Sequence, residues 1–309
     1  MGSDSIYDRH HEVFLLWACR ETGVFDALFA GYGRPDAVAE HAGITDRASG
    51  IVLDALADSG YVRETKDGYE PTDELRGFDP GTPPVERGIL PHRVDSLENY
   101  IRLPETMRTG ESPEPTEEGF KNYMGAMASI PDGTLRAIVT AAEHAHPRPE
   151  RVLDVGGGPG RFSAEFARRG AAVTLLDQPE VLDLLADHHA DLDVDVVEGD
   201  ARQSLPAGFD LVFSARMTVS LSLPGIREYV GNVFEALEPG GTFAAAEWVR
   251  GRADVAGRFG VHMLSMSDVG NTYTEDAYRS ALESAGFTDP EIREVPDTRF
   301  QLVVGRKPG

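Results

Sequence analysis

The sequence of 309 residues has one cysteine, few lysines and no long hydrophobic run. With Cys19 alone, neither an internal disulfide nor a cysteine cage for a metal ion can form. No uninterrupted apolar stretch reaches the ~18 residues that a membrane-spanning helix needs. The first residues, MGSDSIYDRHHE, lack the basic region and apolar core of a secretory signal. We therefore expect a soluble, cytoplasmic protein.

Basic residues are also scarce, because 29 of them stand against 52 acidic ones and give a formal net charge of −23. This charge repels phosphate backbones and anionic membranes, so neither nucleic acid nor a membrane is expected as a partner. Salt screens the self-repulsion of such a surface. The composition favours a halophilic protein, and an acidic protein from a GC-rich mesophile is the alternative. The lysines are Lys66, Lys121 and Lys307.

What the chain does have is a helical first part. Apolar residues at helical spacing predict one long helix over residues 8–30 and shorter helices over 35–42 and 46–59. A hairpin turning on Asp67-Gly68 follows, and this order is typical of a winged helix. Helices are then predicted over 86–103 and 117–145.

From Arg151 onward, strands alternate with helices, which indicates βαβ units on a parallel sheet. The last two predicted strands, 291–295 and 300–304, are joined by a short turn and must pair antiparallel. The predicted fold class is α/β. We expect a doubly wound, Rossmann-like sheet with an antiparallel last strand, preceded by a mostly α, winged-helix-like domain.

A glycine-rich loop lies where the first strand of this sheet turns into its first helix. Glycines at 156, 158 and 160 give the spacing G-x-G-x-G, whereas the dinucleotide form would need glycine at Arg161. Asp154 stands just before them and would repel a pyrophosphate but attract an ammonium or sulfonium group. These features favour S-adenosylmethionine over NAD.

Two further acids are predicted at the ends of the next strands. Asp177 lies where a carboxylate accepts both ribose hydroxyls, and Asp200 lies where it can take an adenine amino group. One such acid alone would be read equally well as a solvated or capping aspartate. Three at consecutive strand ends favour a cofactor site.

Eight segments together resemble the plant-type small-molecule O-methyltransferases, a family that includes hydroxyindole, caffeate and antibiotic-tailoring enzymes. The resemblance runs almost end to end, and the combination is specific although no single motif is. The segments are Gly23–Leu28, Leu56–Val62, Val152–Gly160, Leu176–Pro179, Glu198–Asp200, Ala236–Gly241, Thr274–Tyr278 and Ala285–Phe287.

The resemblance implies a winged-helix-like dimerisation domain at 1–84, a helical connector at 85–147 that contributes to the acceptor pocket, and a class I methyltransferase domain at 148–309. It also implies an active site closed partly by the partner subunit of a homodimer. The residues expected to bind the cofactor are Asp154, Gly156, Gly157, Gly158, Asp177, Gln178, Gly199, Asp200, Ala201, Ser214 and Arg216.

The sequence departs from the family at the catalytic base. The family histidine, in a Lys-x-x-x-His-Asp-Trp segment, falls on Val219, and valine cannot take a proton. The family's Gly-x-Glu-Arg-Thr segment is changed as well, at 270–274, and only the acid after the following strand is kept, as Glu247. Arg216 either replaces the lost lysine near the cofactor or pairs with an acid.

Three interpretations follow from the missing histidine. Another group takes the proton, with His262 the best-placed candidate and Glu247 its orienter, although His262 can equally be a packed helix residue. Alternatively, the acceptor is a carbon, sulfur, amine or acidic phenol that needs only positioning. Lastly, the chain binds the cofactor without methylating. We favour methyl transfer with an altered or absent base.

Apolar side chains in two predicted helices are candidates for the acceptor pocket, although methionines at helical spacing more often fill a core. An apolar pocket suits an aromatic, prenylated or quinone-like acceptor. The candidates are Phe120, Met124, Met127, Met263 and Met266.

Two rival functions are weaker. A winged helix also binds DNA, but the helix at 46–58 carries one arginine against three aspartates, the wrong charge for a major groove. The apolar first helix with Trp17 instead suits a dimer interface. The adjacent pairs His10-His11 and His188-His189 do not converge on one helix face, so we expect no metal and interpret them as solvated histidines.

Overall fold

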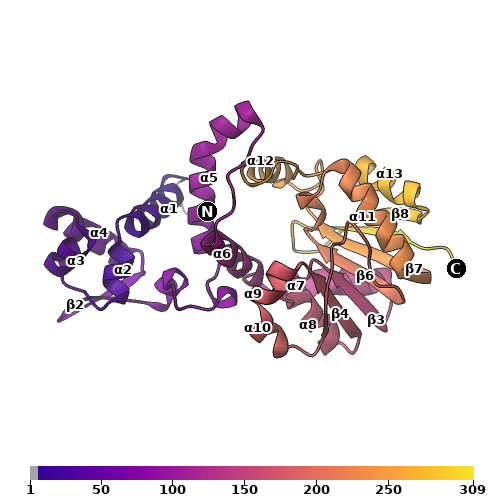
Figure 1. The fold of residues 1–309 in the computed structure, drawn as a ribbon, viewed down its shortest axis with the longest axis horizontal. Coiled ribbons are helices and arrows are strands. Elements are labelled where there is room, and N and C mark those ends of the chain that lie inside the picture. Colours follow the sequence, from indigo (N-terminus) through magenta and orange to yellow (C-terminus); the bar gives the residue numbers. More distant parts are fainter. Residues whose placement is uncertain (1–5) are drawn as a thin grey trace. The chain divides into compact units, whose positions relative to one another are not determined.

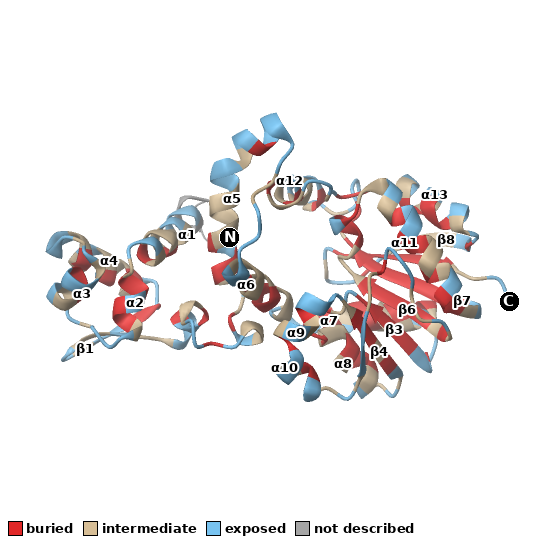
Figure 2. Cartoon of the chain, in the orientation of Figure 1, coloured by how far each residue is buried: buried red, intermediate tan, exposed pale blue. Residues whose placement is uncertain are grey.

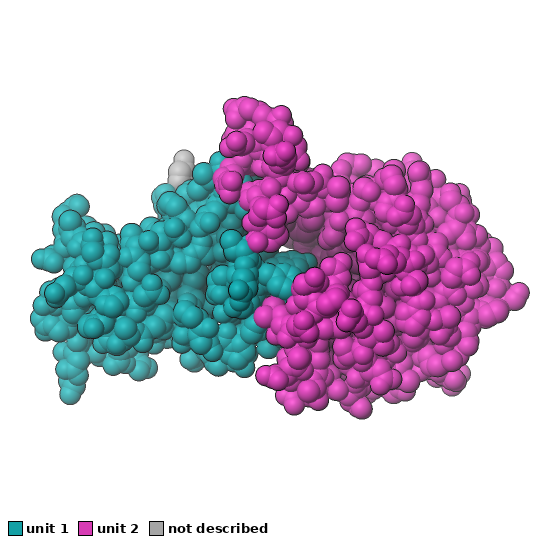
Figure 3. All heavy atoms as spheres, in the orientation of Figure 1, with its two compact units in different colours: residues 1–101, 116–129 teal, residues 102–115, 130–309 magenta. Residues whose placement is uncertain are grey.

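The computed structural model describes residues 6–309, with side chains from residue 10 on. The chain forms two compact units (Figure 3). One contains the residues up to 101 together with 116–129, and the other contains 102–115 together with 130–309. The boundaries expected from the sequence at 84 and 147 stay a prediction.

The first unit begins with four helices followed by an antiparallel hairpin (Figure 1). The single helix predicted over 8–30 is wrong, because Gly23 adopts a left-handed φ of 78° that separates α1 from α2. Thr45 caps α4 by accepting a hydrogen bond from the Ala48 amide. These elements are α1 (Ile6–Glu21), α2 (Val24–Phe29), α3 (Pro35–Ala42), α4 (Asp46–Asp58), β1 (Val62–Thr65) and β2 (Gly68–Pro71).

The core of this unit is apolar and contains the single cysteine. Leu16, Leu53 and Leu56 are fully buried in it, and Cys19 is only 1% exposed. Burial raises the pKa of the Cys19 thiol to about 12, so the sulfur stays a neutral, unreactive thiol.

A buried arginine holds helix α6 in the same unit. Arg87 donates to Asn122 Oδ1 at 2.8 Å and to the Thr82 carbonyl at 3.1 Å, and it pairs with Glu118. The single helix predicted over 117–145 is wrong, since α6 and α7 are separate helices with Pro131 between them. The elements here are η1 (Asp73–Phe78), η2 (Pro84–Glu86), α5 (Leu90–Thr109), which continues into the second unit, and α6 (Glu117–Ala128).

The second unit is built on a seven-stranded sheet in the order β5-β4-β3-β6-β7-β9-β8 (Figure 1). Neighbouring strands from β5 to β7 are parallel, and β9 runs antiparallel to both β7 and β8. The predicted α/β fold class with its antiparallel last strand is therefore confirmed. The strands are β3 (Arg151–Val155), β4 (Ala172–Asp177), β5 (Asp195–Glu198), β6 (Phe209–Ala215), β7 (Leu237–Glu247), β8 (Thr288–Glu294) and β9 (Gln301–Arg306).

Helices cover both faces of this sheet, as the alternation along β7 shows. Ala244 and Ala246 pack in one apolar cluster with α7 and α8, and Ala245 packs in the other with α11 and α13. The central strands are therefore buried on both sides (Figure 2). The helices are α7 (Asp132–Ala145), α8 (Arg161–Arg168), α9 (Pro179–Leu184), α10 (Ala186–Ala190), η3 (Thr218–Ser220), α11 (Leu223–Ala236), α12 (Ala256–Met266) and α13 (Glu275–Ala285).

In residues 6–309, every helix is too short or too polar to cross a membrane.

Candidate active site

The glycine loop between β3 and α8 has a backbone that only glycine adopts easily. Gly156, Gly158 and Gly160 have φ values of 69°, 51° and 71°, in the left-handed region. A Cβ added at Gly157 would lie 2.6 Å from Leu175 Cγ, so no side chain fits there either. A ligand can thus approach the bare backbone and the amides at the start of α8.

Asp154 lies at the foot of this loop and is only 1% exposed. Its Oδ2 accepts a hydrogen bond from the Ser163 hydroxyl at 2.6 Å. Burial raises the pKa of the Asp154 carboxyl to about 7, although the Ser163 hydrogen bond opposes the shift. A carboxyl of this kind is stabilised in its charged form when a cation lies beside it.

Asp177 ends the neighbouring strand β4 and is bonded to the same loop. Its Oδ2 accepts from the Gly158 amide at 2.8 Å, and its Oδ1 accepts from the Gln178 amide at 2.8 Å. Burial raises its pKa as well. Because β4 pairs with β3 in parallel, the ends of the two strands bring both acids to one edge of the sheet.

Asp200 follows strand β5 and is held by its own turn. Its two oxygens accept from the Arg202 amide at 2.9 Å, the Arg202 guanidinium at 2.9 and 3.1 Å, and Gln203 at 3.3 Å. The hydrogen bonds from Arg202 lower the pKa of Asp200 to about 2. All four lone-pair directions of the carboxylate are thereby used, so an adenine amino group would have to compete for them. Gly199 donates to the Asp177 carbonyl at 3.0 Å, and Ala201 is 7% exposed.

The end of β6 carries the next two predicted residues. Ser214 is fully buried in the strand. Arg216, just past it, has a φ of 54° and donates its amide to the Ala246 carbonyl at 2.9 Å. Its guanidinium carbon lies 5.5 Å from the centre of the Trp248 ring, so a cation–π contact holds it at the end of β7.

Glu247, the last residue of β7, is fully buried. Its Oε1 accepts from the Thr218 amide at 3.1 Å, whereas its Oε2 has no hydrogen-bond partner among residues 10–309. Burial raises the pKa of Glu247 to about 7, opposed by the Thr218 hydrogen bonds and the charge of Arg216. A buried carboxyl oxygen without a partner is costly in a stable fold and is a common feature of functional sites.

Val219, where the resemblance predicts the family's histidine, directly follows Thr218, the residue that donates to Glu247. It is 3% exposed, and its carbonyl accepts from the Asn271 amide at 2.9 Å. A Cβ at Gly270 would lie 2.8 Å from the Val219 carbonyl oxygen and 2.7 Å from Met263 Cε. The structure therefore brings Met263 and Val219 to the same place.

The other predicted residues lie on two helices of different units. On α12 of the second unit, His262 is half-buried with its ring centre 5.2 Å from that of Phe259, and Met266 lies one turn further on. Glu247 Oε2 makes no bond to His262, because that oxygen has no partner. Phe120, Met124 and Met127 lie on α6 of the first unit, where Met124 is 3% exposed and belongs to the buried face.

The sequence did not predict that two histidines contact the glycine loop. The interpretation of His188-His189 as a solvated pair is wrong, because His189 is 5% exposed. His189 Nε2 lies 2.8 Å from the Gly158 carbonyl oxygen, and His188 Nε2 lies 3.0 Å from that of Pro159. No motif could have indicated this, since the contacts arise from the packing of α10 on the loop.

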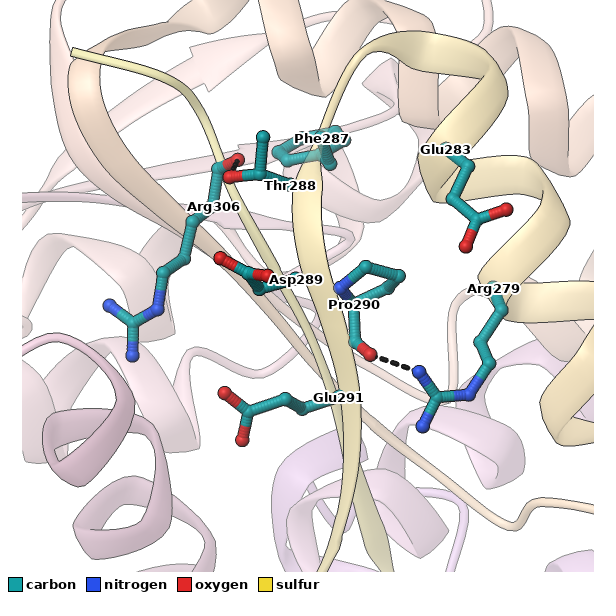
Figure 4. A pocket seen from close by; sticks show the side chains of 8 residues that line it. All are labelled: Arg279, Glu283, Phe287, Thr288, Asp289, Pro290, Glu291 and Arg306. Carbon is teal, nitrogen blue, oxygen red and sulfur yellow. Dashed lines mark hydrogen bonds between the residues drawn. The ribbon is translucent and has the colours of Figure 1, made fainter.

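A cavity of about 880 Å³ lies at the other end of the sheet, where β8 begins and β9 ends (Figure 4). Arg279 donates to the Pro290 carbonyl there, and Arg306 and Glu291 extend from the two strands. In the β7–β9 pair, Thr242 lies opposite Arg306 and Glu247 lies opposite Gln301. The cavity beside Arg306 is therefore at the other end of strand β7 from Glu247. Among the side chains of residues 10–309, no cluster of histidine, cysteine and acidic groups could hold a metal ion.

Known methyltransferases share this sequence pattern. Residues 152–241 match the family model described as a methyltransferase domain. The tetracenomycin polyketide synthesis 8-O-methyl transferase TcmO of Streptomyces glaucescens is 27% identical over 307 residues, covering 91% of this chain and 89% of the relative. The 3-hydroxy-5-methyl-1-naphthoate 3-O-methyltransferase of Streptomyces sahachiroi is 26% identical over 303 residues, covering 91% of this chain and 86% of the relative.

The fold is shared too. Human N-acetylserotonin methyltransferase, solved in complex with SAM, matches with a TM-score of 0.72 at 21% identity, and 100% of each chain is covered. The sheet order with its antiparallel last strand is that of the class I methyltransferase fold. Together, these likenesses support the class I S-adenosylmethionine-dependent O-methyltransferase family that the sequence predicted.

Proposed function

We propose that the chain transfers a methyl group from S-adenosylmethionine to an aromatic or quinone-like small molecule, with Glu247 in place of the missing histidine base. The observation that carries the cofactor site is the set of acids around the glycine loop, Asp154 and Asp177 above all. Both are at the ends of adjacent parallel strands, and Asp177 is bonded to the loop itself.

The residues present fit this cofactor. Asp154 is a buried acid that pairs with no basic side chain of residues 10–309, so it suits a cationic group such as the ammonium of the cofactor's amino acid. Asp177 keeps further lone pairs for the two ribose hydroxyls, because each of its oxygens accepts a hydrogen bond from one backbone amide. Gly199, Ala201, Gln178, Ser214 and Arg216 would complete the site. Asp200 is the weakest member, since Arg202 and Gln203 occupy its carboxylate.

When bound, S-adenosylmethionine supplies an electrophilic methyl group. The remaining task of the protein is to align the acceptor and to take its proton. Glu247 Oε2 is suited to the second part because it is buried, unpartnered and close to half ionised near neutral pH. His262 stays the alternative proton acceptor, acting independently of that oxygen.

The acceptor class is proposed from the apolar side chains and from the relatives. Met263 and Val219 both approach Gly270, and Met263 and Met266 on α12 would line an apolar pocket of the second unit. Phe120, Met124 and Met127 on α6 stay candidates from the sequence. The names of two relatives refer to tetracenomycin polyketide synthesis and to a naphthoate, and a naphthoate is aromatic. A member of this family that binds the cofactor without methylating is the second candidate, and it is favoured only by Val219.

The oligomeric state, the domain bounds and the cellular location are proposals as well. We propose a cytoplasmic homodimer with a winged-helix-like dimerisation domain at 1–84, a connector at 85–147 and the methyltransferase domain at 148–309. The helices and hairpin of α1 to β2 support the first of these.

Calorimetric titration with S-adenosylmethionine and S-adenosylhomocysteine in high-potassium buffer tests the cofactor site. We expect both to bind, after which phenols, quinones and amines can be screened as acceptors with a methyl-labelled cofactor. A folded protein that bound neither compound would refute the site. Binding of both without transfer to any acceptor would favour the second candidate.

Cofactor affinity should rise with pH up to about 7 and then level off. The pKa of Asp154 is about 7 in the free protein. A bound cation lowers it, so the charged carboxylate binds more tightly than the protonated one and affinity gains up to about tenfold per pH unit below 7. Titrations between pH 5.5 and 8 check this. Asp154→Asn should flatten most of the slope, and an unchanged slope would contradict the assignment.

Salt should stabilise the protein. With a net charge of −23, screening of repulsion between carboxylates should raise Tm by roughly 5 °C between 0.1 and 2 M KCl. Differential scanning fluorimetry measures this. The gain should shrink near pH 5, close to the isoelectric point of about 4.7, and an equal gain at both pH values would exclude the charge explanation.

A further inference from the structure

Helix α10 places two adjacent histidines, His188 and His189, against the glycine loop. The role that we infer for them involves contact with the loop and no contact with the cofactor. His189 Nε2 lies 2.8 Å from the Gly158 carbonyl oxygen, and His188 Nε2 lies 3.0 Å from the Pro159 carbonyl oxygen. A carbonyl oxygen can only accept, so both Nε2 atoms carry a hydrogen and donate it.

These two hydrogen bonds hold the part of the loop, Gly158 to Gly160, that has few other hydrogen bonds. Pro159 has no amide hydrogen, so the peptide between Gly158 and Pro159 can be held only by its carbonyl, which His189 binds. The next peptide is held at both ends, because the Gly160 amide donates to the Gly157 carbonyl at 2.9 Å and His188 binds its carbonyl.

The end of strand β4 accepts hydrogen bonds from the backbone amides of the loop. The Gly156 amide donates to the Leu176 carbonyl at 2.8 Å, and the Gly158 amide donates to Asp177 at 2.8 Å. The amide and the carbonyl of Gly158 are therefore fixed by Asp177 and His189. With three residues at left-handed φ, the loop would otherwise have great conformational freedom.

The stability of the fold alone does not account for His189. Its ring is 5% exposed, yet its Nδ1 is buried without a hydrogen-bond partner among residues 10–309. Leaving a buried acceptor unpaired is unfavourable, and an apolar residue of similar size would remove the unpaired Nδ1 but would release the buried Gly158 carbonyl. The gain from this histidine is the fixed carbonyl of Gly158.

We propose that His188 and His189 are positioning residues, which hold the glycine loop in the conformation that binds the adenosyl cofactor. The proposal rests on the proposed function for the identity of that cofactor. Because the loop is already ordered before the ligand arrives, binding loses less conformational entropy. Second contacts of this kind are typically worth about 10-fold or more in affinity at metal sites, and we expect a similar scale here.

Three substitutions test this. His189→Leu removes the donor to the Gly158 carbonyl, whereas His189→Gln keeps a donor at the position of Nε2. His188→Leu removes the hydrogen bond to the Pro159 carbonyl, which is the more exposed of the two. We expect the Kd of S-adenosylhomocysteine to rise about 10-fold in His189→Leu and to stay within about 2-fold of wild type in His189→Gln. The KM for S-adenosylmethionine should rise in the same way while kcat at saturation is kept.

Hydrogen exchange of the peptide covering residues 156–160 gives a readout that needs no ligand. The loop amides should exchange faster in His189→Leu than in wild type and in His189→Gln. His144→Leu, at an exposed histidine of α7, is the matched control and should change neither exchange nor affinity.

The outcomes separate the two proposals. Wild-type affinity and wild-type exchange in His189→Leu would overturn the positioning role. If that variant does not fold, His188→Leu decides by the same two measurements. A wild-type protein that failed to bind S-adenosylhomocysteine would refute the proposed function, and the exchange rates would still show whether the histidines hold the loop.

Discussion

Replacing Asp177 by alanine should raise the Kd of S-adenosylhomocysteine at least about 100-fold and leave the fold intact. The carboxylate is proposed to accept both ribose hydroxyls, and hydrogen bonds to a charged group contribute about 1.5–3 kcal/mol each. The substitution also removes the bonds to the Gly158 and Gln178 amides, so the loop loses one of its fixed points. Isothermal titration calorimetry measures the affinity.

Two controls make this result specific. Asp183→Ala changes an exposed aspartate on the next helix and should leave the affinity unchanged. Asp177→Asn keeps one acceptor oxygen for the Gly158 amide and should fall between alanine and wild type. Tight binding by Asp177→Ala would exclude the proposed cofactor site, provided that circular dichroism and Tm show a folded protein.

Replacing Glu247 by glutamine should lower kcat by about 100-fold or more, the usual scale for loss of a general base, with cofactor affinity within about 2-fold of wild type. Glutamine keeps the Oε1 that accepts from Thr218 and has the same shape, so the fold should be retained. Only the unpartnered Oε2 loses its capacity to take a proton. Single-turnover transfer of a labelled methyl group to an acceptor from the screen measures the rate.

The pH profile identifies the base. Since the pKa of Glu247 is about 7, the wild-type rate should rise with pH up to about 7 and then level off, as the carboxylate forms. Glu247→Gln should lose this rise. His262→Gln tests the alternative: a large loss in that variant with a normal rate in Glu247→Gln would assign the proton to the histidine instead.

The fold of the second unit could be predicted because parallel strands buried on both faces form unbroken apolar runs. Leu211 to Phe213 is such a run. The glycines after Val155 indicate the turn from the first strand into the first helix. Asp154 and Asp177 could be placed for the same reason, since a residue that follows a parallel strand must lie at the same edge of the sheet.

The failures have equally physical causes. Periodicity continues across Gly23, so a helix break that depends on one left-handed residue could not be distinguished from a helical glycine. The sequence predicted Asp200 at the end of a strand, and it follows β5. The hydrogen bonds from Arg202 to its carboxylate arise from the short turn after it, which no pattern indicated. His189 acts on a segment 31 residues away in the sequence, a contact that only the packed fold reveals.

The buried thiol of Cys19 makes this chain suited to site-specific labelling. At 1% exposure, with its pKa raised to about 12, this sulfur should not compete for a maleimide at neutral pH. A cysteine introduced on the surface would then be the only reactive thiol of the protein. Spectroscopic probes can therefore be attached one position at a time, without first removing a native residue.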